Sequence, residues 1–330
     1  MPMQRRSALF TLSSLALAAG VLPARALAQA AYPTRAVTVV VPFPPGGPTD
    51  VAARLAAQRL GERLGQPIVV ENRPGALAML GTDRVAKSAP DGHTLLLTPQ
   101  SPITIAEHFE PRPPYNAARD LVPVAAVVTS PVLVLGAADG PPDMRGLVEK
   151  ARANPGKLLY GAPGLGNEMH LTWELIRSAL NIDVMAVPYQ GTNPAVLDLM
   201  AGRVQVVLTS PSSVKGHIAE RKLRALATLT PQRLPEFPDI PTMAEAGLRD
   251  LNMPVAWLGL LAPSATPPAV VARLRQEIAQ ISAEPAYRQR MTELGFELPA
   301  FTPDAFPALV AGQRTQWGAL IRAQNIQIGK

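Results

Sequence analysis

Short, continuous apolar runs alternate with segments of helical periodicity along most of the chain. Residues Ala36–Phe43 read AVTVVVPF, a run typical of strands that are buried on both faces of a parallel sheet. In the next segment, Val51–Leu64, apolar residues such as Ala53, Ala57 and Leu60 share one face of a helix, while charged residues lie elsewhere. This repeated β-α-β order predicts an α/β fold with parallel sheets.

Further predicted elements continue the pattern toward the end of the chain. Strands are predicted at Pro67–Glu71, His93–Thr98, Val122–Leu135, Leu158–Tyr160, Val184–Tyr189, Val204–Thr209, Ala225–Leu229 and Val255–Ala262. Helices are predicted at Gly81–Ser88, Met144–Ala153, Glu168–Ala179, Pro194–Ala201, Ala269–Ile281, Tyr287–Leu294 and Asp304–Ala323. The length of 330 residues favours two domains, because a domain usually has about 100–200 residues. We interpret Pro131, which interrupts the run at 122–135, as a crossing point between two lobes.

The proline and cysteine counts exclude several classes of protein. With 36 prolines, the chain has about twice the average proline content of roughly 5%, which argues against long coiled coils and helical bundles. With no cysteine, it has no disulfides, thiolate nucleophiles, iron–sulfur clusters or cysteine-ligated zinc. The four histidines are widely separated, and the motifs of serine hydrolases, P-loop NTPases and zinc proteases are missing. We therefore expect no catalytic residues, no metal site and no cofactor.

Residues 1–30 have the pattern of an export signal rather than of a folded segment. The basic pair Arg5-Arg6 precedes a mostly apolar run at Ala8–Leu22, and Ala28–Ala30 supplies the small residues of a cleavage site near Ala30. The run is shorter than the about 20 apolar residues of a comfortable membrane span. We expect a soluble periplasmic protein without a stable membrane anchor, exported by either the general secretory or the twin-arginine route.

The charge of the chain does not indicate a nucleic-acid partner. Removing residues 1–30 removes three arginines and no acid, so that the formal charge falls from +6 to +3. The remaining basic residues are scattered, and aromatic residues do not interleave with them. The electrostatic footprint of a nucleic-acid-binding protein is therefore missing.

Three predicted strand-to-helix loops share one chemical design. They are Pro42–Asp50, Gly161–Asn167 and Tyr189–Pro194. Each brings glycine, which permits close approach of a ligand to the backbone, to a helix N-terminus with unpaired N–H groups and a partial positive charge. In open α/β sheets, ligands bind beyond the carboxyl ends of the strands, where these loops lie. The loops are candidate anion sites, although the same residues also serve as ordinary caps and tight turns.

The residues at the three helix starts predict which residue is the N-cap of each helix. In the first loop, Gly47 is predicted as the N-cap, with Pro48 at the first helical position. In the second loop, Asn167 is predicted as the N-cap. In the third loop, Asn193 is predicted to cap a helix that starts at Pro194.

At these loops the chain resembles the Bug-type extracytoplasmic solute receptors, the substrate-binding components of tripartite tricarboxylate transporters. The matching segments cover nearly the whole mature chain: Tyr32–Arg35, Val39–Asp50, Val70–Gly75, Ala89–Leu96, Ala153–Lys157, Val187–Gly191, Lys222–Ala227 and Pro241–Gly247. The resemblance implies a two-lobed periplasmic-binding-protein fold of type II, with the ligand held in a cleft between the lobes. We expect lobe 1 at 31–130 and 255–330, and lobe 2 at 131–254.

The resemblance also implies a function. In this family, the carboxylates of a small organic acid are held mainly by backbone amides, hydroxyls and ordered water. The predicted ligand-binding residues are Phe43, Gly47, Thr49, Asp50, Gln100, Ser101, Gly164, Gly166, Asn167, His170, Tyr189, Gly191, Thr192 and Ser210. Among them, Asp50 is expected to position the loop rather than to contact a carboxylate, which it would repel. Trp257 is open to interpretation as a cleft cover or as a core residue.

The chain departs from the family pattern at several places that bear on specificity. Leu77 and Met79 stand where many relatives have a glycine-rich stretch, and they would narrow the cleft if they face it. Hydroxyls at 209–213 replace a common Asp-Asn segment. Glu168 adds a negative charge beside the second loop. We favour the interpretation that Glu168 points away as a first-turn acid; the alternative is a ligand with an amino group or with a single carboxylate.

These observations predict a non-enzymatic, monomeric periplasmic receptor. It would capture a small organic acid by hinge closure and deliver it to the membrane subunits of a transporter. Two alternatives are a ligand-loaded receptor that signals to a partner, and a receptor for an amino acid, an amide or an aromatic acid.

Overall fold

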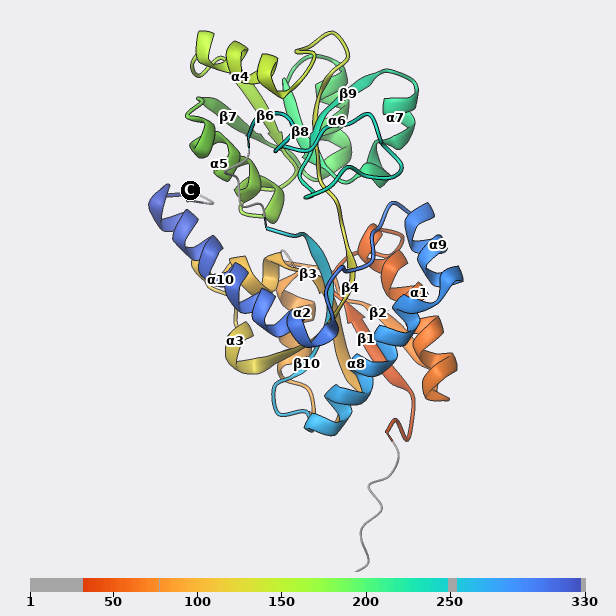
Figure 1. Ribbon diagram of the computed structural model, residues 1–330. Coiled ribbons are helices and arrows are strands. Elements are labelled where there is room, and N and C mark those ends of the chain that lie inside the picture. The colour runs from red at the N-terminus through yellow and green to blue at the C-terminus, as the bar shows by residue number, and fades with distance from the viewer. Residues whose placement is uncertain (1–31, 77, 249–253, 328–330) are drawn as a thin grey trace, which may run out of the picture. The chain divides into compact units, whose positions relative to one another are not determined.

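The structure, a computed structural model, describes residues 32–76, 78–248 and 254–327. These residues form two five-stranded sheets, with strand orders β2-β1-β3-β10-β4 and β7-β6-β8-β5-β9 (Figure 1). The first sheet contains β1 (Val37–Val41), β2 (Ile68–Asn72), β3 (Thr94–Pro99), β4 (Leu121–Thr129) and β10 (Trp257–Pro263). The second contains β5 (Leu133–Ala137), β6 (Leu158–Ala162), β7 (Val184–Pro188), β8 (Val206–Thr209) and β9 (Leu223–Thr228).

Helices connect and cover the strands. The α-helices are α1 (Pro48–Leu64), α2 (Met79–Ala86), α3 (Ala117–Asp120), α4 (Met144–Ala153), α5 (Glu168–Leu180), α6 (Thr192–Met200), α7 (Lys215–Ala219), α8 (Pro268–Ala283), α9 (Pro285–Glu293) and α10 (Phe306–Ala323). A π-helical turn at Ser101–Ile105 and 3-10 turns at Ala106–His108, Pro211–Ser213 and Pro303–Ala305 complete the described elements.

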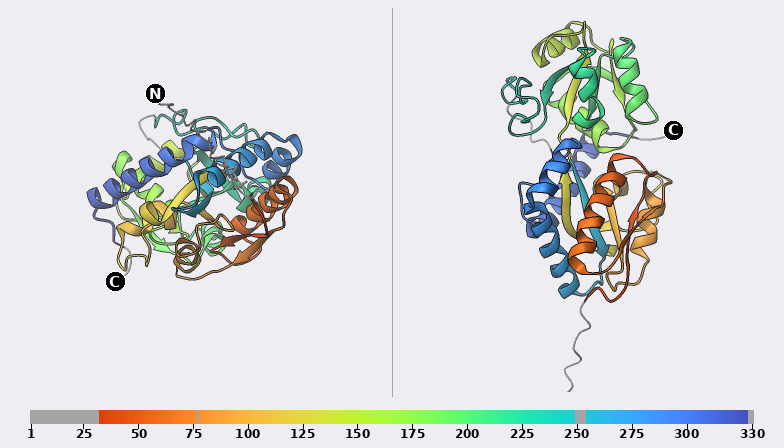
Figure 2. Two further views of the ribbon diagram at one scale, coloured as in Figure 1. Left: turned by 90° about the horizontal axis from the view of Figure 1, so that it is seen from below. Right: turned by 90° about the vertical axis from the view of Figure 1, so that its right-hand side faces the viewer.

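The first sheet is buried on both faces because its neighbouring side chains point to opposite layers. Val39 belongs to a core that β1 shares with α1, α8 and α9. Val40, the next residue, belongs to a core with α2 and α10 on the other face. Figures 1 and 2 show α1 and α8 on one side of the sheet and α10 on the other. Burial on both faces explains why β1 is a continuous apolar run.

The second sheet is covered in the same way. Trp173 of α5 and Met144 of α4 pack on one face, where Tyr160 of β6 stacks on the Trp173 ring with centroids 5.1 Å apart. Residues of α6, such as Leu199, pack on the other face. The layers therefore match the predicted α/β architecture.

The strand directions correct one expectation. The sequence predicts parallel sheets, but both sheets are mixed. β10 pairs antiparallel with β3 and β4, and β5 pairs antiparallel with β8 and β9. The physical reason is that β5 and β10 each begin where the chain arrives from the other sheet, so each must run away from the shared edge while the strands beside it run toward that edge.

The crossing of the chain fixes which edges of the two sheets are neighbours. β4 runs parallel to β1 and β3, so Thr129 at its end lies at the edge where β1 and β3 end. β5 runs antiparallel to β8, so Leu133 at its start lies at the edge where β6, β7 and β8 end. An extended chain of four residues spans at most about 14 Å. The carboxyl ends of the parallel strands in the two sheets are therefore brought next to each other.

The two sheets take their strands from the parts of the sequence that the prediction gives to the two lobes. The first draws on residues 37–129 and 257–263, and the second on residues 133–228. The run predicted at 122–135 is two strands, β4 and β5, which lie in different sheets on either side of Pro131. We propose that the lobes divide as the sequence predicts, at 130/131 and at 254/255.

Helix α10 joins the first sheet to the helices of the second. Trp317 and Ile321 of α10 pack with Leu171 of α5 in a separate apolar cluster. Beyond α10, Nε2 of Gln324 donates a hydrogen bond to Oγ of Ser178, at 2.7 Å. The C-terminal helix therefore contacts both halves of the protein.

Trp257 is a core residue. It is 1% exposed, and its ring meets Phe306 edge-on at a centroid distance of 4.9 Å. Its Nε1 donates to Oε1 of Gln313 at 2.7 Å, and Nε2 of Gln313 donates to the carbonyl oxygen of Val255, also at 2.7 Å. Of the two interpretations of Trp257, these contacts favour the core.

Replacing Gln313 with alanine should lower the free energy of unfolding of the protein. The Gln313→Ala variant leaves the Trp257 N–H and the Val255 carbonyl without their partners, a loss of about 1–3 kcal/mol in the free energy of unfolding. Urea unfolding of the mature protein measures it. Gln289→Ala, which removes an exposed glutamine on α9, should change stability by less than about 0.5 kcal/mol. Equal stability of the two variants would contradict the role assigned to Gln313.

Candidate functional site

The first predicted loop follows β1 and leads into α1. Gly47 is the N-cap of α1 and Pro48 its first residue, as the sequence predicts, and no side chain caps the helix. The amides of the first turn therefore have no acceptor within the helix, and they carry the partial positive charge of a helix N-terminus. Phe43 is half-buried against the core beneath α1, and Thr49 is buried at the helix start.

Asp50 holds this loop in place. Its buried carboxylate accepts hydrogen bonds from the N–H of Gly46 (2.9 Å), Nε of Arg54 (2.9 Å) and Nδ2 of Asn72 (2.8 Å). Asn72 also donates to the carbonyl oxygen of Phe43 at 3.1 Å. Desolvation acts to raise the pKa of Asp50, but the three donors outweigh it and hold the pKa below its usual value. These contacts make Asp50 a positioning residue, the role that the sequence favours.

The second loop is organised around His170. Asn167 caps α5 as predicted, because its Oδ1 accepts the N–H of His170 at 2.9 Å. Nδ1 of His170 accepts the N–H of Gly166 at 3.1 Å, and Nε2 lies 4.0 Å from Oε1 of Glu174. The ring is 5% exposed, and burial lowers the pKa of His170 despite the nearby Glu174 carboxylate. The imidazole is thus an acceptor within the loop, and Nδ1 cannot at the same time donate to a ligand.

Both glycines of the second loop are needed by its geometry. Gly166 has φ +75°, a left-handed conformation that side chains disfavour. A Cβ at Gly164 would lie 3.0 Å from Nδ2 of the capping Asn167. The loop therefore closes tightly over its own cap.

The third loop is hydrogen-bonded to the second. The N–H of Tyr189 donates to the carbonyl oxygen of Ala162, and the N–H of Gly191 donates to that of Pro163, at 2.8 and 3.1 Å. The hydroxyl of Tyr189 donates to Oδ2 of Asp198 on α6, at 2.8 Å. The second and third loops are therefore one rigid surface, and the Tyr189 hydroxyl is directed at its own helix.

The start of α6 differs from the prediction. The N-cap is Gly191 and the helix begins at Thr192, so the prediction that Asn193 caps and Pro194 comes first is wrong. The reason is that Gly191 has φ +102°, which lets the backbone turn into the helix two residues early. No side chain caps α6. The amides of Thr192 and Asn193 therefore have no acceptor within the helix, and Pro194 has no N–H to satisfy.

Two further predicted ligand residues, Ser101 and Ser210, lie at the neighbouring edges of the two sheets. Ser101 begins the π-helical turn after β3, and its Oγ donates a hydrogen bond to Oε2 of Glu168 at the start of α5. Ser210 follows β8, with its Oγ 2.9 Å from Oγ of Ser212 and 3.3 Å from Oγ of Ser213. The bond between Ser101 and Glu168 joins the edges of the two sheets directly. It also shows that the Glu168 side chain reaches the first sheet. That Glu168 points away from a bound anion, the interpretation favoured from the sequence, stays a prediction.

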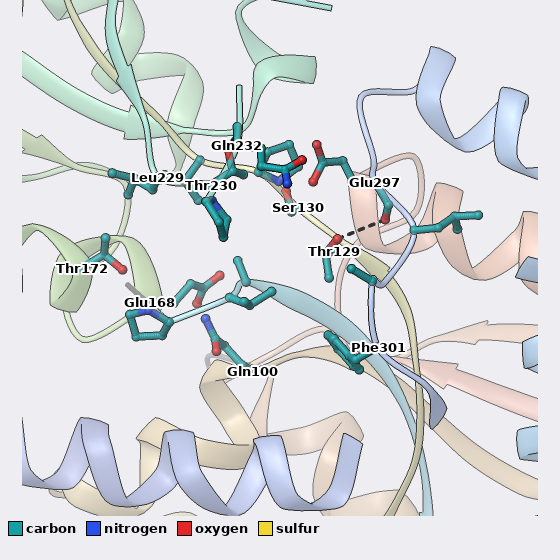
Figure 3. A pocket seen from close by; sticks show the side chains of 18 of the residues that line it. Gln100, Thr129, Ser130, Glu168, Thr172, Leu229, Thr230, Gln232, Glu297 and Phe301 are labelled. Carbon is teal, nitrogen blue, oxygen red and sulfur yellow. Dashed lines mark hydrogen bonds between the residues drawn. The ribbon is translucent and has the colours of Figure 1, made fainter. Parts of the chain in front are cut away.

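A cavity of about 490 Å³ lies between these edges, against the crossing segments of the chain (Figure 3). Of the predicted ligand residues, only Gln100 lines the cavity. Glu168, which is not one of them, also lines it. Gln100 is 2% exposed, and its Oε1 has no hydrogen-bond partner among the described residues. The sequence did not predict the other polar lining residues, such as Thr129 and Glu297, because they are brought here only by the crossing and by the segment after α9.

The comparisons with known proteins identify the family. Residues 52–326 match the family described as "Tripartite tricarboxylate transporter family receptor". The chain belongs to this family. BugT of Bordetella pertussis is 36% identical to the receptor over 305 residues, which cover 90% of this chain and 91% of BugT.

Solved structures support the same assignment. An R. palustris protein solved with adipate is 31% identical, with a TM-score of 0.79, over 90% of this chain and 99% of that one. MatC of Rhodopseudomonas palustris with bound malate is 34% identical, with a TM-score of 0.74, over 88% and 100%. The receptor has the two-lobed fold of periplasmic binding proteins and is a Bug-type solute receptor rather than an enzyme.

The remaining sequence features are placed as follows. Leu77 lies outside the residues that the structure describes. Met79 begins α2 and packs, half-buried, against the core between α2 and α10. In the described part of the receptor, no cluster of three acidic or histidine side chains could hold a metal ion. No helix within that part is long and apolar enough to cross a membrane.

The Asp50 network should make stability depend on pH in a defined direction. Because the folded-state pKa of Asp50 is lowered, its stabilisation should be complete above the ordinary aspartate pKa of about 4 and should be lost as the pH falls through the lowered value. The Asp50→Asn variant should therefore be less stable than the wild type at pH 7, and the difference should shrink toward pH 3. Urea unfolding across this range measures it. Asp139→Asn, at an exposed position, should show no such difference. A gap that stays constant with pH would contradict the network.

Proposed function

We propose that this receptor binds a small organic acid between its two sheets, with the carboxylate groups held by the backbone amides at the starts of α1 and α6. The observation that carries the proposal is the pair of helix N-termini without side-chain caps at the neighbouring edges of the two sheets. Such N-termini bind anions because their free N–H groups and the helix dipole both favour negative charge.

The contacts around the helix starts leave the backbone amides accessible to a small anionic group such as a carboxylate. The carboxylate of Asp50 and Nδ1 of His170 already have hydrogen-bond partners within the protein, which favours the backbone amides as donors to a ligand. Gly47 has open space where a side chain would begin, apart from the carbonyl oxygen of Pro44 at 3.7 Å. Gly191 has nothing within 4 Å of that position. A ligand can therefore approach the amides closely at both helix starts.

The relatives support the same class of ligand. The solved structures with adipate and with malate each hold a dicarboxylate, and both are more than 30% identical to this chain. We infer a mono-, di- or tricarboxylate as the ligand here. Phe43, Thr49, Ser101, Gly164, Tyr189 and Ser210 remain predicted ligand residues on the surrounding loops.

The family supports a proposal for the location and the partners of the receptor. We propose that residues 1–30 direct export, with cleavage near Ala30, and that the mature receptor acts as a monomer in the periplasm. It would deliver its ligand to the membrane subunits of a tripartite tricarboxylate-type transporter.

A ligand screen should identify a carboxylate. Adipate, malate and other mono-, di- and tricarboxylates are compared with amino acids, amides and neutral solutes by thermal shift. A ligand at 100 times its dissociation constant stabilises the folded state by about 2.7 kcal/mol, which a thermal shift detects. We expect a carboxylate to give the largest shift. If only neutral solutes raise the midpoint, the proposed function is wrong.

Removing a single amide should weaken acid binding. Thr192→Pro deletes one N–H at the first position of α6, where proline is tolerated. Affinity for the acid found in the screen should fall about tenfold to a hundredfold, because a hydrogen bond to a charged group contributes about 1.5–3 kcal/mol. Thr192→Ala keeps the N–H and removes only the hydroxyl, so it should bind more tightly than the proline variant. Calorimetric titration measures both, and equal affinities would contradict the amide mechanism.

A further inference from the structure

The 490 Å³ cavity does not include the helix starts of α1 and α6, which the carboxylate proposal uses. The first crossing segment (129–132) and the second (229–233 with 254–256) form two of its walls. The start of α5 and the segment 297–301 form the others. None of the residues at the starts of α1 and α6 lines it. Figure 3 shows Glu168 and Gln100 on one side of the space and Thr129 and Glu297 on another.

The charged groups of the cavity are mostly acceptors. Glu297 is fixed by its backbone, which exchanges two hydrogen bonds with Thr129, at 2.8 and 3.0 Å. Its carboxylate has no hydrogen bond or ion pair with the described residues, and burial raises the pKa of Glu297. Glu168 contributes a second carboxylate, and the buried Oε1 of Gln100 lacks a donor.

Among the described lining residues, the one cation is Arg233, and it already has other partners. Nε of Arg233 donates to both carboxylate oxygens of Glu245, at 3.1 and 2.8 Å. Its Nη1 donates to the carbonyl oxygen of Pro238 at 2.7 Å. Arg233 therefore does not neutralise Glu168 and Glu297, and a half-buried carboxylate without a partner is unfavourable.

Apolar side chains make up much of the remaining wall, which also includes Ser130, Thr172, Thr230 and Gln232. Met169, Leu229, Leu298 and Phe301 line the space together with several prolines. Apolar walls with a few convergent polar groups are typical of small-molecule sites, and about 300–1,000 Å³ is their usual volume. The chemistry that fits is an apolar body carrying a positively charged N–H donor.

We propose that this cavity is a second ligand site, which takes a small organic ammonium ion with an apolar body. The ammonium group binds Glu297 or Glu168, and the body packs against Met169 and Phe301. Both crossing segments line the site, and they must change conformation whenever the two sheets move relative to each other. An occupant is therefore in contact with the parts of the chain that set the arrangement of the sheets, and it can change the affinity for the acid by linkage.

The test uses the mature receptor and three matched probes. They are the 2-phenylethylammonium ion, the neutral 2-phenylethanol and the anionic 3-phenylpropionate, titrated by calorimetry. We expect the ammonium ion to bind at least about tenfold more tightly than the neutral probe, since the decisive hydrogen bonds are charge-assisted. The anionic probe is titrated into receptor saturated with the acid, so that it reports on the cavity alone, and there it should bind at least about tenfold more weakly than the ammonium ion. Equal binding of the neutral probe, or no binding of the ammonium ion at millimolar concentration, overturns the proposal.

Variants then locate the site. Glu297→Gln and Glu168→Gln each preserve the shape of the side chain, and at least one should weaken binding of 2-phenylethylammonium about tenfold. Glu293→Gln, which removes an exposed carboxylate on α9, should leave it unchanged. Thermal unfolding checks that the variants are folded. If both cavity variants bind like the wild type, the site is not this cavity.

A competition experiment separates this site from the acid site. Thr192→Pro should keep its affinity for 2-phenylethylammonium even though its affinity for the acid falls. Saturation of the wild type with the acid should change the ammonium affinity without abolishing it. Strict competition between acid and ammonium ion overturns the second site while leaving the carboxylate proposal intact.

Discussion

The short crossing from Thr129 to Leu133 is the constraint on which the functional surface depends. The chain leaves β4 at the edge where β1 and β3 end and enters β5 at the edge where β6, β7 and β8 end. Because so few residues join the sheets, the carboxyl ends of their parallel strands become neighbours. Two helix N-termini that arise independently, at α1 and α6, are thereby placed at a common interface, which is the usual position of ligands in α/β proteins.

Within each loop, side chains satisfy one another so that backbone amides remain available. Asp50 is held by three donors, and His170 accepts from Gly166. Gly191 binds the carbonyl of Pro163 and ties two loops into one surface. A buried polar group without a partner is costly, so these internal bonds stabilise the loops and engage the carboxylate of Asp50 and Nδ1 of His170. In the proposed function, this surface recognises charge through backbone geometry, which suits carboxylates of varied length.

The interface between the sheets carries two opposite electrostatic environments. The helix starts at α1 and α6 favour anions, whereas the cavity beside the crossing segments presents Glu168, Glu297 and the amide oxygen of Gln100. Glu168 stands at the junction, because it lines the cavity and also accepts a hydrogen bond from Ser101 across the two edges. In the two proposals, the acid and the ammonium ion therefore bind at different places in one receptor.

The sequence alone determined the alternating α/β architecture, the crossing at Pro131, the family, and the caps at Gly47 and Asn167, because apolar period and capping chemistry are local properties of the chain. It failed at the start of α6, where the positive φ of Gly191 lets the helix begin at Thr192. It also failed for the strand directions. Only the tertiary structure decided the strand directions, since they depend on where the chain crosses between the two sheets. It alone also brings together residues far apart in the chain, such as Ser101 with Glu168 and Thr129 with Glu297.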